Sequence, residues 1–264
     1  MKQHTSPGTR YFLPVLAALI IAIAFAFFLP RTAHAATTTA EMRKLVRGRT
    51  YTCYDVTGDR KHDVFKYQAG ETGYTNLYIN NRYVNRIWTA RGAIVYWARI
   101  TNSKVFLVVN YGLYGGNGNT ILQYKNGKFR PVSGKAVGKY NYLYANPSRV
   151  AGHSIFFTGS PRNMPSEFVQ NDKRVTGTSQ FRLENGSFSL VSRYLKVGGT
   201  TVHRTQKGFY TSTSNKKKNT SGMYVPAGAT VKIIKIYKPS EAEYAGGTWY
   251  LLQYGRRTGW LYAW

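Results

Sequence analysis

Alternating apolar and polar positions dominate the chain after residue 50 and predict β-strands. Three segments alternate on both sides of a two-residue turn: Leu77 to Val84, Leu122 to Arg130 and Phe181 to Leu190. Their turns are Asn80-Asn81, Asn126-Gly127 and Asn185-Gly186. Asn and Gly tolerate positive φ at the two central positions of a hairpin turn, so each segment predicts a β-hairpin.

The three turns lie 46 and 59 residues apart, which is about the length of one four-stranded propeller blade. Three such units are too few to close a ring, because propellers usually have about 4–8 blades. Further strands are predicted at Ala93 to Ile100, Lys104 to Asn110 and His153 to Thr158. We therefore expect an all-β fold whose antiparallel, blade-like hairpin domain is either an open propeller-like stack or a sandwich.

Two segments depart from this alternation. Residues 37–48 have weak helical spacing at Ala40, Met42 and Leu45, which predicts a short helix. The glycine-rich segment from Tyr111 to Asn119 predicts a long flexible connection, since its glycine spacing does not match that of a phosphate-binding loop.

The first 35 residues have the pattern of a signal peptide. Lys2 and Arg10 precede an apolar run from Phe12 to Leu29, and Ala33-His34-Ala35 is a small-x-small cleavage motif. The alternative is an uncleaved membrane anchor, because eighteen apolar residues approach the length that spans a bilayer. Cleavage predicts a secreted chain with no integral membrane span.

The charge balance predicts an anionic partner. The 264 residues include 37 Lys and Arg against 10 Asp and Glu, a formal charge of +27. Removing the three bases of residues 1–35 would leave +24. The bases are spread along the chain rather than gathered on one element, and Lys216-Lys217-Lys218 is the one basic run, so we do not expect nucleic acid as the partner.

The final segment contains Val225-Pro-Ala-Gly228 before Thr230-Val-Lys-Ile233, then Trp249-Tyr-Leu-Leu-Gln-Tyr254 and Thr258-Gly-Trp-Leu261. In this order the motifs resemble the bacterial SH3 domain, over about a quarter of the chain. The resemblance implies a small SH3-like barrel at residues 199–264, after a β-rich domain with three repeated hairpins at 36–198. It also implies a shallow groove that binds wall peptide or glycan through aromatic faces, and its candidate residues here are Tyr210, Trp249 and Tyr254.

Three of the ten acids occur in the nine residues Asp55 to Asp63, DVTGDRKHD. The stretch resembles the calcium loop of FG-GAP and VCBS repeats, and the candidate ligand positions are Asp55, Thr57, Asp59, Lys61 and Asp63. Thr57 stands where the family has Asn, and Arg60 stands where it has the glycine that eases the turn. Two alternatives stay open: a bound calcium ion, and a metal-free acidic turn neutralised by Arg60, Lys61 and His62. We expect the second, a degenerate loop.

Catalytic signatures are absent from the sequence. Cys53 with one of His62, His153 or His203 could supply a nucleophile and a base, but no flanking motif of a hydrolase or transpeptidase accompanies them. The expected function is therefore non-enzymatic: a secreted envelope protein of a Gram-positive bacterium that binds peptidoglycan or teichoic acid and needs no cofactor unless calcium occupies the loop. The alternative is a wall or polysaccharide hydrolase whose catalytic domain lies in the middle of the chain.

Overall fold

The computed structural model describes residues 40–53, 55–89, 92–101, 104–113, 116–132, 143–161, 164–169, 175–239 and 247–263. These residues form strands and no helix, so the predicted all-β class is confirmed. The expected signal peptide lies outside the described residues. In the described part of the chain, no helix has the length and the hydropathy needed to span a bilayer.

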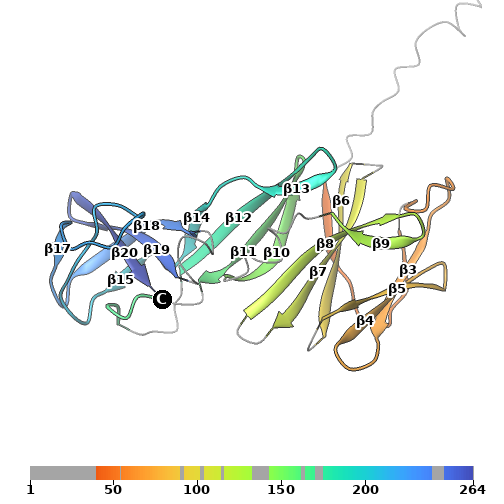
Figure 1. The fold of residues 1–264 in the computed structure, drawn as a ribbon, viewed down its shortest axis with the longest axis horizontal. Helices are drawn as coiled ribbons and strands as arrows, with labels where there is room; N and C mark the ends of the chain where they lie inside the picture. Colours follow the sequence, from red (N-terminus) through yellow and green to blue (C-terminus); the bar gives the residue numbers. More distant parts are fainter. Residues whose placement is uncertain are drawn as a thin grey trace, which may run out of the picture. The chain divides into compact units, whose positions relative to one another are not determined.

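Twelve strands form three consecutive four-stranded meanders, in which each strand pairs antiparallel with the next (Figure 1). The first meander contains β2 (Tyr51–Thr52), β3 (Val64–Ala69), β4 (Tyr74–Ile79) and β5 (Arg82–Trp88). The second contains β6 (Ala93–Thr101), β7 (Lys104–Leu113), β8 (Gly116–Lys125) and β9 (Lys128–Pro131). The third contains β10 (Leu143–Ala151), β11 (Ser154–Pro161), β12 (Val175–Glu184) and β13 (Ser187–Leu190).

The three predicted hairpins are confirmed, and each joins the last two strands of a meander. Asn80 and Asn81 have φ of 51° and 61°, while Asn126 and Gly127 have 50° and 77°. Asn185 and Gly186 likewise have 50° and 77°. Because positive φ at both central residues gives the turn the twist of its flanking strands, each short turn fixes how the two strands that it joins are paired.

The short helix expected at residues 37–48 is wrong where the structure describes it. Residues Glu41–Lys44 form β1, which pairs antiparallel with the edge of β6 from Glu41↔Arg99 to Lys44↔Tyr96. The open edge of β6 offers this segment backbone hydrogen bonds that outweigh its weak helical spacing.

The flexible connection expected from Tyr111 to Asn119 is also wrong. Its described residues continue β7 and β8, with Tyr111 opposite Gly118. A Cβ atom on Gly118 would overlap the Tyr111 ring. The glycine therefore lets the ring lie across the neighbouring strand, and the segment is a paired hairpin arm.

The second meander is buried on both faces, as strict alternation along its strands allows. Val95, Trp97 and Leu107 pack with the first meander, in a cluster that includes Phe65 and Leu77. The intervening Ala98, Phe106 and Val108 pack in a second cluster with Ile155, Phe157 and Phe181 of the third meander. The second meander thus packs against the first through one cluster and against the third through the other. The expected layout, an open propeller-like stack or a sandwich, stays a prediction.

Seven strands follow the third meander: β14 (Tyr194–Gly199), β15 (Val202–Arg204), β16 (Phe209–Tyr210), β17 (Tyr224–Val225), β18 (Thr230–Tyr237), β19 (Thr248–Tyr254) and β20 (Arg257–Ala263). Five of them belong to the same sheet as the third meander, whereas β16 and β17 pair with each other in a separate two-stranded sheet. β14 pairs with both β12 and β18, and β18 to β20 continue the ladder.

The strands expected in the C-terminal segment are confirmed, but no sheet of the described residues closes into a barrel. The small barrel implied by the bacterial SH3 resemblance is therefore not found as a closed ring there. The expected boundary between residues 198 and 199 falls inside β14. The division into a hairpin domain and a separate C-terminal module stays a prediction.

Candidate functional sites

The acidic loop is held by hydrogen bonds from its carboxylates to the protein itself. Asp63, fully buried before β3, accepts through Oδ2 from the N–H groups of Val56 at 2.7 Å and Thr57 at 2.9 Å. Its Oδ1 accepts from the Thr57 hydroxyl at 3.1 Å and from Nδ2 of Asn80 at 2.7 Å. Asn80 belongs to the β4–β5 turn, so Asp63 fastens the loop to the hairpin.

The other two acids of the loop bind its backbone. Asp55 accepts from the N–H groups of Gly58 and Arg60, and Asp59 accepts from Lys61 at 2.9 Å. Desolvation alone raises the pKa of Asp55, but the hydrogen bonds to its carboxylate outweigh that effect and lower the pKa. Arg60 has a φ of 66°, which lies in the left-handed region. The arginine therefore adopts the backbone conformation for which the calcium-loop families have glycine.

Calcium occupancy of the loop stays a prediction. All five candidate ligand residues make hydrogen bonds within the loop: Asp55, Thr57, Asp59 and Asp63 through side-chain oxygens, and Lys61 through its backbone N–H. In the residues that the structure describes, no three His, Cys, Asp or Glu side chains are grouped so that they could hold a metal ion.

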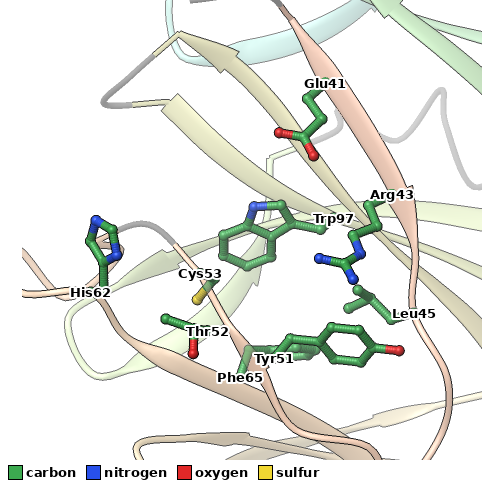
Figure 2. Close-up of a pocket in the computed structure, with 9 residues that line it drawn as sticks. All are labelled: Glu41, Arg43, Leu45, Tyr51, Thr52, Cys53, His62, Phe65 and Trp97. Atoms are coloured by element: carbon green, nitrogen blue, oxygen red, sulfur yellow. The ribbon is translucent and has the colours of Figure 1, made fainter.

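A pocket of about 210 Å³ brings Cys53 and His62 together, close to β1, β2 and β6 (Figure 2). Its described lining is Glu41, Arg43, Leu45, Tyr51, Thr52, Cys53, His62, Phe65 and Trp97. Desolvation, with a smaller contribution from the negative charge of Asp63, raises the pKa of the Cys53 thiol to about 12. A nucleophilic cysteine needs the opposite shift. The pocket therefore gives no support to a cysteine hydrolase, and Cys53 is a buried free cysteine.

We predict that the Cys53 thiol is inert in the folded protein. Moving its pKa from 9.0 to about 12 lowers the thiolate fraction near neutral pH by roughly a thousandfold, and burial excludes the reagent. Iodoacetamide labelling followed by mass spectrometry should be slow in buffer and fast in denaturant. Equally fast labelling in both conditions would contradict the burial of this thiol.

The three aromatic residues expected in a ligand groove do not share one surface. Tyr210 is 56% exposed, and its ring centroid lies 4.9 Å from that of Tyr224. Trp249 is fully buried, with its ring centroid 5.0 Å from that of Tyr262. Tyr254 is partly buried against the larger core cluster. Only Tyr210 of the three presents a large exposed ring.

A different groove, of about 160 Å³, lies on the outer face of the third meander and β14. Its described lining residues are Arg149, Phe156, Thr178, Gln180, Val191, Ser192, Tyr194 and Lys196. Strand register builds it in two rows: Arg149, Phe156 and Gln180 lie side by side, and so do Thr158, Thr178 and Lys196. Successive side chains of a strand point to opposite faces of the sheet, so these residues lie on the outer face while their neighbours in sequence point into the core.

The groove is basic, hydroxyl-rich and aromatic at one end. The guanidinium carbon of Arg149 lies 3.6 Å from the centroid of the Phe156 ring, which orients its planar fork. The Thr158 hydroxyl lies 2.9 Å from that of Thr178 and donates to Ser148 at 3.1 Å. No acidic side chain is among the described residues that line the groove.

The C-terminal strands supply the aromatic end of the groove. Tyr194 is half exposed, and its ring centroid lies 4.9 Å from that of Tyr237. Nδ2 of Asn215 donates to the Tyr194 hydroxyl at 3.2 Å, and Asn215 directly precedes the basic run at residues 216–218. The groove thus combines residues from distant segments, which the sequence pattern did not bring together.

Comparison with known proteins identifies no relative: no family model matches the chain, and no curated protein or solved structure shows a significant match.

Proposed function

We propose that the chain is a secreted, non-enzymatic envelope protein that binds an anionic wall polymer in the groove on the outer face of the third meander. The observation that carries the proposal is the pair Arg149 and Lys196 in a groove with no described acidic lining residue. The formal charge of +27 favours the approach of any polyanion to this site.

The chemistry of the groove fits a phosphodiester polymer such as teichoic acid. A guanidinium fork binds two phosphate oxygens at once, and a lysine ammonium adds a second positive charge. The hydroxyl of Thr178 and the amide of Gln180 can bind the sugar or polyol between phosphates, while the Tyr194 ring packs against its carbon skeleton. The signal-peptide pattern and the bacterial SH3 resemblance are consistent with a partner in the wall.

The proposal predicts that replacing Arg149 and Lys196 together with glutamine weakens binding to teichoic-acid-bearing wall by about tenfold or more. Each substitution removes a charge-assisted hydrogen bond, which is worth about 1.5–3 kcal/mol. The matched control replaces Lys128 and Arg130 of β9 with glutamine, which removes the same charge from two exposed positions. Co-sedimentation with purified wall gives the affinities.

Binding of the parent chain should also weaken as salt rises from about 0.1 M to 1 M, because the screening length falls from about 10 Å to 3 Å. With wall stripped of teichoic acid, the parent and the groove variant should bind equally, because the ligand of the groove has been removed. Equal losses in the groove variant and in the β9 control would assign binding to diffuse charge and overturn the role of the groove.

A further inference from the structure

The outer face of the first meander carries exposed aromatic rings in register. Three rows run across its strands: Lys66, Tyr78 and Tyr83; Gln68, Asn76 and Arg86; and Tyr74 with Trp88. Alternate residues of the same strands, among them Phe65 and Leu77, are fully buried on the opposite face. We call the outer surface made by these three rows the aromatic face.

The rings of the aromatic face are available to a ligand and held in place. Tyr83 and Trp88 are 56% and 55% exposed. The ring centroids of Tyr78 and Tyr83 lie 5.9 Å apart in an edge-on arrangement, and the guanidinium carbon of Arg86 lies 4.4 Å from the centroid of Tyr74. Because they rise from paired strands, the rings form a platform rather than a mobile cluster.

The composition of the face distinguishes between classes of partner. The row of Gln68, Asn76 and Arg86 separates the two aromatic rows, so the face has no continuous apolar centre of the kind that a buried protein interface has. Its charge is also low for a polyanion site, because Arg86 pairs with Glu71 at 2.9 Å and Lys66 is the other base of the rows. Aromatic rings interleaved with the amides of Gln68 and Asn76 instead match the two sides of a sugar: its C–H face and its hydroxyl or acetamido edge.

We propose that the aromatic face binds a glycan strand of N-acetylated amino sugars that carries carboxylates, as the wall glycan does. Tyr83 and Trp88 stack on sugar rings, and Gln68 and Asn76 hydrogen-bond to the acetamido groups. The Lys66 ammonium, 5.8 Å from the centroid of Tyr78, attracts the carboxylates. This site is separate from the basic groove and does not depend on it.

The test uses the full secreted chain and soluble wall glycan strands freed of teichoic acid and of peptide stems. We expect binding that quenches or shifts tryptophan fluorescence and that persists at about 1 M salt, because stacking and neutral hydrogen bonds are screened little. Replacing Tyr83 and Trp88 together with alanine should weaken binding about tenfold or more. Replacing Lys66 with glutamine should weaken it less.

Two controls separate this site from the others. Replacing Tyr224 with alanine removes an exposed ring elsewhere, and the Arg149 and Lys196 variant removes the charge of the groove; both should bind the glycan as the parent does. Failure of the parent to bind the strands, or an equal loss in the Tyr224 control, would overturn the proposal. A parent dimer that the Tyr83 and Trp88 variant converts to a monomer would assign the face to self-association instead.

Discussion

Replacing Asp63 with alanine is expected to lower the free energy of unfolding by about 3 kcal/mol or more. The substitution removes a fully buried carboxylate that accepts from two backbone N–H groups, one hydroxyl and one amide. A hydrogen bond to a charged group contributes about 1.5–3 kcal/mol, and the loop would also lose its attachment to the β4–β5 turn. Urea denaturation followed by circular dichroism measures the change.

The matched control is Asp59 to alanine in the same loop. Asp59 is exposed and accepts one hydrogen bond, from Lys61, so its loss should cost about 1 kcal/mol or less. Equal costs for the two substitutions would mean that Asp63 does not fasten the loop to the hairpin.

If the loop bound calcium, the stability of the parent protein would depend on the calcium concentration. A ligand at a hundredfold excess over its Kd stabilises the folded state by about 2.7 kcal/mol. We expect instead that adding about millimolar calcium leaves the melting temperature of the parent equal to that of the chelated sample. A calcium-dependent rise that disappears in the Asp59 to alanine variant would make the loop a metal site.

The acidic loop also shows how far spacing alone predicts structure. The alternation of Asp55, Thr57 and Asp59 suits both a cation cage and a set of carboxylates that accept backbone hydrogen bonds. What distinguishes Asp63 from Asp59 is burial and the contact with Asn80, seventeen residues later in the chain. That contact depends on how the β4–β5 hairpin lies against the loop, which no local pattern encodes.

Local chemistry predicted the hairpins because a two-residue turn fixes its own register. Asn126-Gly127 and Asn185-Gly186 require nothing beyond their own φ values and the strands beside them. Two other features depend on a partner strand that must first be in place. They are the pairing of β1 with β6 and the position of the Tyr111 ring over Gly118. Pattern reasoning therefore gave a helix and a flexible connection at those two segments.

The binding surfaces were harder still to predict. Arg149 and Lys196 belong to β10 and β14, and they line the same groove because the two intervening strands set their register across the sheet. Polar alternation marks all four strands as half exposed, yet it does not indicate which exposed residues share a groove. The exposed aromatic residues of the first meander had a clearer signal, since Tyr83 and Trp88 lie on the strand that follows a predicted hairpin turn.

Trp249 illustrates why residue type alone could not separate a ligand contact from a packing residue. Tryptophan is frequent in both settings, and the strand from Thr248 to Tyr254 is mostly apolar on both faces. In the structure, Trp249 lies between Tyr237 and Tyr262 in one row across β18, β19 and β20. Trp249 is completely buried at the middle of this row. Tyr194 of the groove packs against Tyr237, at one end of the same row.

Replacing Trp249 with alanine should therefore lower the free energy of unfolding by about 3–5 kcal/mol, the usual cost of deleting a buried aromatic side chain. Replacing the exposed Tyr210 with alanine should change it by about 0.5 kcal/mol or less. Denaturant titrations of both variants, with wall co-sedimentation at a temperature where each is folded, distinguish packing from binding. A Trp249 to alanine variant with parental stability and lost wall binding would show that this ring contacts the ligand directly.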